Sequence, residues 1–222
     1  RKESSAASDV YKRQLSNRSA YPCLDQNIYL NQASLGLLSD ETVTKMTEFL
    51  STVARHGNLK MTDREEANFL NPLRGKVARL LQAKQENIAL VSSASEILSQ
   101  IPELCKPRIG SKVLLVSTDF PAITRPWLLK AKTSNFEVCF IHEVPEIDLT
   151  NAIIEKVDSN TSVVCLSYVQ FASGTQVNVE NLSQYTKEVG AKLVIDVTQA
   201  AGAVPISINA VSYTHLRAHE TS

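Results

Sequence analysis

The sequence predicts an α/β fold, with a mainly parallel sheet and helices on both faces. From residue 87 onward, strand-like apolar runs alternate with helix-like stretches. The strand-like runs are apolar throughout, which is typical of strands whose two faces are both covered. Regular alternation of the two kinds of segment favours an open parallel sheet with right-handed connections.

The first predicted element is a helix over residues 40–56. The Ser39 hydroxyl suits an N-cap, and Asp40 and Glu41 would complement the helix dipole in the first turn. Gly57 can end the helix. One helical face carries an apolar stripe, made of Val43, Met46, Leu50 and Val53.

A second helical stretch is predicted to begin at residue 62. Thr62 and Glu65 have the spacing of a capping box, in which each residue's side chain binds the other's backbone N–H. Pro72 then demands either a kink or a fresh helix start after Asn71.

The alternating pattern follows. Five strand-like runs lie at residues 87–91, 112–117, 136–141, 161–167 and 192–196. The helix-like stretches between them lie at residues 94–104, 121–132, 148–157 and 179–189. No internal repeat or low-complexity linker interrupts this order, so we expect one large domain or most of one.

Both ends of the chain are predicted to be non-native. The runs Asp9–Gln14 and Val211–His215 can be encoded by one DNA element read on opposite strands, and both resemble translated transposase adapters used to prepare sequencing libraries. The spacing of His215 and His219 also suits a zinc-binding helix, but the adapter origin is the favoured interpretation. No metal site is therefore expected.

We accordingly expect residues 1–14 and 211–222 to be adapter-derived and leave them out of the fold prediction. Residues 15–60 are expected to form an N-terminal segment and helix, and residues 61–210 a partial α/β domain. Ala210 itself is doubtful, because two bases of its codon would belong to the adapter. Amplifying the locus without adapters tests this origin, and finding the same codons there would refute it.

The composition argues against several functional classes. The 23 basic and 23 acidic residues balance, so nothing indicates a nucleic-acid or polybasic membrane surface. No apolar run approaches the roughly 18 residues of a membrane span. We expect the scattered cysteines to be small core residues in a reducing compartment, which indicates the cytoplasm, although a targeting peptide ahead of the chain stays open. They are Cys23, Cys105, Cys139 and Cys165.

Ligands of such sheets bind outside the carboxyl ends of the strands, so the residues after each strand are candidate site residues. After the first strand, backbone N–H groups near Ala94 and the Ser95 hydroxyl could hold an anion at a helix N-terminus. The alternative is that Ser93 or Ser95 only caps the helix. No Gly-x-Gly-x-x-Gly is present to support a dinucleotide site.

Two further strand ends carry candidate residues. Phe120 follows the second strand, where its ring could cover a planar ligand or simply pack in the core. Asp196 ends the last apolar strand, and a carboxylate there needs a partner because burying it alone is costly. That partner is either the next helical turn or a cationic ring nitrogen.

Four ordered segments resemble class V aminotransferases, the fold-type-I pyridoxal-phosphate enzymes that include cysteine desulfurases, selenocysteine lyases and isopenicillin-epimerase-like proteins. They are "YLNQASLGLLS" (29–39), "SSASE" (92–96), "DFPAI" (119–123) and "VIDVTQAAGAVPISI" (194–208). The resemblance spans nearly all of residues 28–209. It implies the large cofactor-binding domain of such an enzyme, incomplete at its C-terminus.

The resemblance assigns pyridoxal 5′-phosphate as cofactor and six residues to its site. Ala94 and Ser95 would bind the phosphate, Phe120 would stack on the ring, and Asp196 would pair with the ring nitrogen. Gln199 would reach the phenolic oxygen. The asparagine that often touches this oxygen in desulfurases aligns with Phe171, so either Gln170 replaces it or the contact is lost.

The resemblance also implies what is missing. The family's Schiff-base lysine follows the aspartate by roughly two dozen residues, beyond Ala210, so no catalytic residue is expected within this fragment. Lys192 precedes Asp196 and is not a substitute. None of the four cysteines corresponds to the catalytic cysteine of desulfurases. The 222-residue chain itself is therefore expected to be inactive.

The intact parent is expected to be a homodimeric pyridoxal-phosphate enzyme acting on an amino acid, as a desulfurase or lyase, a transaminase or an epimerase. One alternative is a non-catalytic relative that uses the fold for binding or assembly, which Phe120, Phe171 and the missing lysine favour. A nucleotide-binding α/β domain is a further alternative, weakened by the absent glycine fingerprint.

Overall fold

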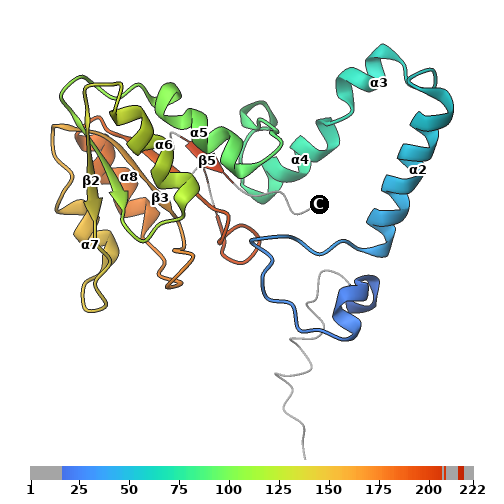
Figure 1. Ribbon diagram of the computed structural model, residues 1–222, viewed down its shortest axis with the longest axis horizontal. Helices are drawn as coiled ribbons and strands as arrows, with labels where there is room; N and C mark the ends of the chain where they lie inside the picture. Colours follow the sequence, from blue (N-terminus) through green and yellow to red (C-terminus); the bar gives the residue numbers. More distant parts are fainter. Residues whose placement is uncertain (1–16, 207, 209–214, 218–222) are drawn as a thin grey trace, which may run out of the picture. The chain divides into compact units, whose positions relative to one another are not determined.

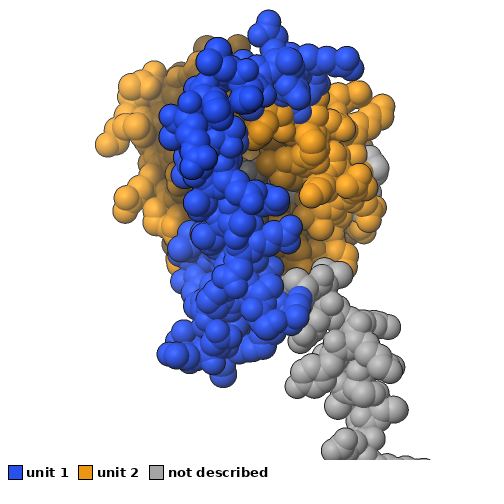
Figure 2. Space-filling model, turned by 90° about the vertical axis from the view of Figure 1, so that its right-hand side faces the viewer, with its two compact units in different colours: residues 1–68, 220–222 blue, residues 69–219 orange. Residues whose placement is uncertain are grey.

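The computed structural model describes residues 17–206, residue 208 and residues 215–217. The described residues fall into two compact units, one within residues 1–68 and the other within residues 69–219 (Figure 2).

The first unit is helical. It contains the short 3-10 helices η1 (Arg18–Ala20) and η2 (Pro22–Asp25), followed by α2 (Asp40–His56) and α3 (Asp63–Asn68). The Ser39 hydroxyl accepts a hydrogen bond from the Thr42 N–H at 3.2 Å, and Gly57 ends α2 with φ of 55°. The predicted bounds and caps of α2 are therefore confirmed, while its apolar stripe lies exposed.

The predicted capping box opens α3. The Thr62 N–H donates to Glu65 Oε2 at 2.8 Å, and the Glu65 N–H donates back to Thr62 Oγ1 at 3.3 Å. Pro72 lies in the first turn of α4 (Asn71–Leu80), the first helix of the second unit. Of the two outcomes expected at Pro72, the structure shows the fresh helix start.

The second unit is built around a parallel five-stranded sheet in the order β2-β1-β3-β4-β5 (Figure 1). The strands are β1 (Lys112–Val116), β2 (Glu137–Ile141), β3 (Thr161–Ser167), β4 (Lys192–Asp196) and β5 (His215–Arg217). The connecting helices are η3 (Gln85–Asn87), α5 (Ala94–Cys105), α6 (Pro121–Ala131), α7 (Leu149–Ile154) and α8 (Val179–Glu188). This arrangement confirms the predicted fold class.

Helices cover both faces of the sheet, because successive strand residues point to opposite sides. On one face, Val113, Leu115 and Val194 pack with apolar side chains of α5 and α6. On the other, Leu114 and Ile195 pack with apolar side chains of α7 and α8. Burying each such side chain contributes about 1.5–3 kcal/mol, so the two cores fix the sheet between its helix layers.

The predicted strand at residues 87–91 is not observed. Residues Gln85–Asn87 form η3, and Ile88 continues in extended backbone, yet residues 88–91 pair with no strand among the described residues. Only Ile88 of this run packs against the core. An extended apolar run becomes a strand only when a neighbouring strand pairs with it through backbone hydrogen bonds. The pattern of apolar residues along the chain does not show whether such a neighbour is present.

The structure places a short strand within the segment left out of the fold prediction. His215–Arg217 pairs in parallel with Val194–Asp196 of β4. An open strand edge presents unpaired backbone groups that accept almost any extended segment, so three residues can pair there whatever their codons' origin. The adapter origin of residues 1–14 and 211–222 stays a prediction.

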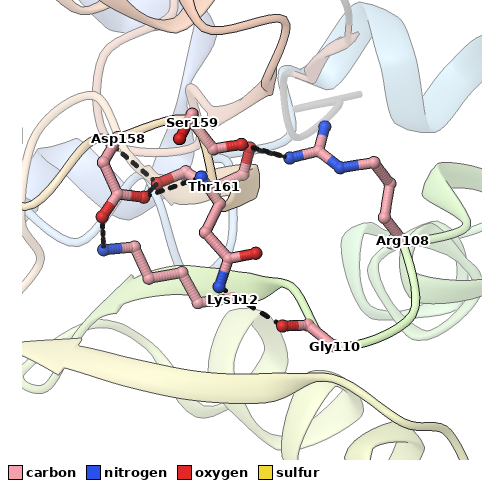
Figure 3. A network of polar contacts seen from close by, with 7 residues as sticks. Arg108, Gly110, Lys112, Asp158, Ser159 and Thr161 are labelled. Carbon is pink, nitrogen blue, oxygen red and sulfur yellow. Dashed lines mark hydrogen bonds and ion pairs between the residues drawn. The ribbon is translucent and has the colours of Figure 1, made fainter.

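A polar network ties the amino ends of β1 and β3 together (Figure 3). The Arg108 guanidinium donates to the Ser159 and Thr161 carbonyls at 2.8 and 3.1 Å. The Lys112 ammonium pairs with Asp158 at 2.9 Å. These contacts lie at the edge of the sheet opposite to the strand ends where a ligand is expected.

The cysteine prediction is right for the core and wrong for Cys23. Cys105 and Cys165 are buried and Cys139 is half-buried, but Cys23 is exposed on η2, a short helix without a buried residue. A single 3-10 turn has no apolar face wide enough to enclose a side chain, so this thiol stays in solvent. All four cysteines are free.

Thiol reactivity should follow this burial. Burial raises the pKa of Cys105 to about 11 and also raises the pKa of Cys165, and the thiolate is the reactive form. At pH 7 a thiol reagent should modify Cys23 first and leave Cys105 and Cys165 intact until urea unfolds the chain. Peptide mass mapping after a timed pulse of iodoacetamide measures this order. Early labelling of Cys165 in folded protein would contradict it.

Among the described helices, none combines the length and the apolar character that a membrane-spanning helix needs.

Candidate functional site

The carboxyl ends of the parallel strands gather the loops that follow β1, β2, β3 and β4 at one edge of the sheet. Ser167 at the end of β3 lies opposite Asp196 at the end of β4 in the strand register. The Tyr168 N–H donates to the Asp196 carbonyl at 2.8 Å, which extends this pairing by one bond into the loop. Two of the loops with candidate site residues therefore start side by side.

Asp196 is buried at this edge. Its side chain lies on the sheet face of Val194, because strand residues two apart share a face. Asp196 Oδ1 accepts hydrogen bonds from the Thr198 N–H at 2.9 Å and the Thr198 hydroxyl at 2.6 Å. The local turn that the sequence offers as one partner of Asp196 is thus present.

Helix α5 packs on the same face as Asp196 and presents its N-terminus to the same edge. Its C-terminal residue, Cys105, accepts a hydrogen bond from the Lys192 ammonium at the start of β4, at 2.7 Å. A helix of 12 residues is about 18 Å long, close to the length of a five-residue strand, about 16 Å. The first turn of α5, with Ala94 and Ser95, therefore reaches the level where β4 ends.

Ser93, rather than Ser95, caps α5. The Ser93 hydroxyl accepts from the Glu96 N–H at 3.2 Å, while Glu96 binds back to the Ser92 N–H at 3.1 Å. This reciprocal pair is a capping arrangement of the kind foreseen as the alternative to anion binding. It leaves the Ser95 side chain exposed in the first turn, so capping of the helix by Ser93 and binding of an anion by Ser95 are compatible.

Phe120 and Phe171 form an aromatic pair at this edge. Their ring centroids lie 5.4 Å apart with an interplanar angle of 86°, an edge-to-face contact. Phe120 is 48% exposed and Phe171 46% exposed, so each ring keeps surface free for a further contact. Phe120 occupies the position before α6, and core packing does not enclose its ring.

Asp119, which the sequence analysis did not single out, also lies at this edge. Asp119 is 5% exposed, and its carboxylate accepts four hydrogen bonds. Oδ1 accepts from the Phe120 N–H and from the Ser167 hydroxyl, each at 2.7 Å. Oδ2 accepts from the Ser167 N–H at 2.7 Å and from Gln170 Nε2 at 3.3 Å. The available signal was an acidic residue just after an apolar strand, the same signal that identified Asp196.

Gln170 is buried beside Asp119 with 1% of its surface exposed. Its Nε2 donates to two acceptors, the Asp119 carboxylate and the Ser167 carbonyl, both at 3.3 Å, which fixes which end of the amide is which. Its Oε1 is buried and accepts no hydrogen bond from the described residues. Such an atom costs about 1–3 kcal/mol and is an available acceptor for a ligand or a water molecule.

Gln199, the last of the predicted site residues, is exposed in the turn after Asp196. The structure therefore brings Ala94, Ser95, Phe120, Gln170 and Asp196 to one edge of the sheet. Among the described residues, no group of three or more His, Cys, Asp or Glu side chains is arranged to hold a metal ion.

Glu143 ties three of the loops at this edge together. It accepts hydrogen bonds from the Thr118 hydroxyl at 3.0 Å, from the Ser173 hydroxyl at 2.7 Å, and from the Thr175 hydroxyl. These partners follow β1 and β3, whereas Glu143 follows β2. The hydroxyls of Thr175 and Ser173 hold the pKa of Glu143 below its usual value of 4.5.

This carboxylate should make stability depend on pH. Because the folded-state pKa is lowered, its contribution is present above the ordinary value of 4.5 and is lost as pH falls through the folded-state pKa. Glu143→Gln should cost about 1 kcal/mol of unfolding free energy at pH 7 and less as the medium is acidified. Urea titrations at pH 7 and in the acidified medium measure this difference in unfolding free energy. Glu146→Gln is the control, because Glu146 is exposed. Equal stability of wild type and Glu143→Gln at pH 7 would refute the role.

The profile described as "Aminotransferase class-V" matches residues 28–214. This chain belongs to the class V aminotransferase family. The match covers most of both compact units, including the four segments on which the sequence resemblance rests.

Curated relatives support the family assignment. The class V chain is 20% identical over 191 residues to the "Uncharacterized aminotransferase YcbU" of Bacillus subtilis, covering 86% of the chain and 50% of that protein. It is 24% identical over 206 residues to a "Probable cysteine desulfurase" of Methanothermobacter thermautotrophicus, covering 91% and 51%. The chain thus spans about half the length of these relatives.

A solved structure shares the fold. A mutant of C-DES with glycine covalently linked to its PLP cofactor superposes with a TM-score of 0.81 at 14% identity, covering 91% of this chain and 55% of that one. At this identity the likeness shows the fold alone, and it confirms that the class V chain adopts the α/β architecture of this group.

Proposed function

We propose that this class V chain binds pyridoxal 5′-phosphate at the carboxyl edge of its sheet, and that the protein to which it corresponds acts on an amino acid. The observation that carries the proposal is Asp196, a carboxylate buried at the end of β4 on the same sheet face as α5. A small ligand with a protonated pyridine nitrogen and an anionic phosphate matches a carboxylate and a helix N-terminus on one side of a sheet.

The other residues at this edge fit the same ligand. The half-exposed ring of Phe120 offers a face for stacking on a planar ring. Gln170 contributes a buried oxygen without a partner among the described residues. Ser95 in the first turn of α5 and Gln199 after Asp196 are both exposed and able to contact a bound molecule.

When bound, pyridoxal phosphate withdraws electrons from the α-carbon of an amino acid, provided that its ring nitrogen stays protonated. Asp196 would hold that proton, because a nearby carboxylate raises the pKa of a cationic group. Ala94 and Ser95 would bind the phosphate through backbone N–H groups and the hydroxyl, and Phe120 would orient the ring. Gln170 and Gln199 would lie at the phenolic oxygen.

We further propose that these 222 residues bind the cofactor without turning over substrate. No lysine follows Asp196 in the sequence. Lys192, at the start of the same strand, donates an ammonium proton to the Cys105 carbonyl at the opposite edge of the sheet. Desulfurase or lyase, transaminase and epimerase reactions all remain candidates for the whole protein, and the names of its relatives support an amino-acid substrate.

Two broader features belong to the same proposal. We propose a homodimer, because the family resemblance implies one, and a cytoplasmic location, because all four cysteines are free. Light scattering on a full-length protein tests the first, and a fully active monomer would contradict it.

Equilibrium dialysis against pyridoxamine 5′-phosphate tests the binding proposal. This probe carries the ring and the phosphate but no aldehyde, so surface lysines cannot capture it covalently. We expect saturable binding, and at least about tenfold weaker binding of pyridoxamine without phosphate, because charge-assisted hydrogen bonds contribute about 1.5–3 kcal/mol. A chain that is folded by circular dichroism and binds neither compound would refute the proposal and favour a non-catalytic relative.

A further inference from the structure

We propose that Asp119 is the positioning residue of this site: it holds the ring of Phe120 and the amide of Gln170 in place. The inference rests on the proposed function only for the identity of the ligand that stacks on the Phe120 ring. Its geometry stands on the described contacts alone.

The first step is the position of Asp119 between two strand ends. It follows β1 by three residues, and it binds both the N–H and the hydroxyl of Ser167, the last residue of β3, at 2.7 Å each. One buried carboxylate therefore joins the exits of two neighbouring strands. Because Ser167 lies opposite Asp196 in the strand register, the contact between Asp119 and Ser167 also lies next to the end of β4, where Asp196 is the second carboxylate.

The second step concerns Phe120. Its backbone N–H donates to Asp119 Oδ1 at 2.7 Å, which fixes the peptide from which the ring projects. Phe120 is half-exposed, so core packing does not hold its ring. The ring is held instead from its backbone by Asp119 and from its side by Phe171, at 5.4 Å between centroids.

The third step concerns Gln170. Because Asp119 and the Ser167 carbonyl are both acceptors, Nε2 must face them, and Oε1 is the atom left to accept. Asp119 thus determines that Gln170 offers an acceptor and not a donor. A ligand group that meets this atom has to bring a hydrogen, such as a hydroxyl or an ammonium group.

The comparison of Asp119 with Glu143 separates positioning from general support. Both are carboxylates at the same edge, both accept several hydrogen bonds, and both join loops that follow different strands. Only Asp119 binds Phe120 and Gln170 directly. Asp119→Asn and Glu143→Gln are therefore matched isosteric substitutions, each of which removes one charge.

The experiment compares wild type with both variants in two measurements. One detects the ring contacts without ligand, and the other gives the affinity for a ligand. Asp119→Asn replaces one carboxylate oxygen by an amide nitrogen, which cannot accept from the Ser167 N–H or from Gln170 Nε2, so the contacts that hold Asp119 in place are broken. In protein labelled at phenylalanine, nuclear Overhauser contacts between the Phe120 and Phe171 rings should be present in wild type and in Glu143→Gln, and lost in Asp119→Asn. Affinity for pyridoxamine 5′-phosphate should fall about tenfold in Asp119→Asn and less than about twofold in Glu143→Gln. In a background with both Phe120→Ala and Gln170→Ala, which lacks the two groups that Asp119 holds, Asp119→Asn should have little further effect on affinity, whereas a loss of general stability would act in either background.

Ring contacts that persist in Asp119→Asn would overturn the proposal, whether or not the probe binds. So would an affinity loss that is the same in both backgrounds. If wild type shows the ring contacts and Asp119→Asn loses them, but no variant binds the probe, the positioning role stands and the proposed function fails.

Discussion

Trp127→Ala should lower the free energy of unfolding by about 3–5 kcal/mol, the largest stability loss that we expect from a single substitution in this chain. Trp127 is 1% exposed in the core between the sheet and helices α5 and α6. Its ring meets Phe136 edge to face at 6.2 Å between centroids. Alanine would remove both the buried area and this contact and would leave a cavity that a close-packed core cannot fill.

Urea titration followed by circular dichroism measures this loss, because Trp127 is the sole tryptophan and its removal abolishes the natural fluorescence probe. Leu128→Ala is the matched control, since Leu128 is the next residue of α6 and is 42% exposed. Trp127→Phe, which removes less volume, gives a measurable midpoint if the alanine variant does not fold. Equal losses of unfolding free energy in Trp127→Ala and Leu128→Ala would contradict the assignment of Trp127 to the core.

Asp196→Asn should weaken the binding of pyridoxamine 5′-phosphate by about 2–5 kcal/mol, or roughly thirtyfold and more. Asparagine keeps an oxygen that can accept from the Thr198 N–H and hydroxyl, so the turn after β4 can persist. What it removes is the negative charge that would keep a ring nitrogen protonated. The substitution therefore separates the local capping role of Asp196 from its proposed role toward the ligand.

Equilibrium dialysis gives the affinity, and the ultraviolet spectrum of the bound probe as a function of pH gives the pKa of its ring nitrogen. That pKa should be lower on Asp196→Asn than on wild type. Thr198→Ala is the control, because it disturbs the same turn and leaves the carboxylate. Unchanged affinity in Asp196→Asn, with a loss in Thr198→Ala, would reduce Asp196 to a capping residue.

The local elements could be predicted because their signals are local. The hydroxyl of Ser39 and the pairing of Thr62 with Glu65 satisfy helix N–H groups within one turn, so neighbouring residues suffice to indicate both helix starts. Continuous apolar runs indicated four strands and, by their alternation with helices, a parallel sheet. That order then directed attention to the strand ends, where Asp196 and Phe120 lie.

The errors arose where a long-range partner decides the outcome. Residues 87–91 have the composition of a strand but pair with none among the described residues, so composition could not classify them. Cys23 has the usual character of a core residue but lies on a turn without an apolar face. Asp119 was passed over because three of its four hydrogen bonds depend on β3 and the loop after it arriving beside β1.

The sequence by itself determined the caps, the order of helices and strands, the parallel sheet and the family resemblance, because each depends on neighbouring residues or on a pattern along the chain. Only the tertiary structure decided how the site is held together. Lys192 binding to Cys105 sets the direction of α5, and Asp119 binding to Ser167 joins two strand ends. Both contacts join residues far apart in the sequence, and shielding from water, partial for the first and complete for the second, strengthens them because water competes less for the same polar atoms.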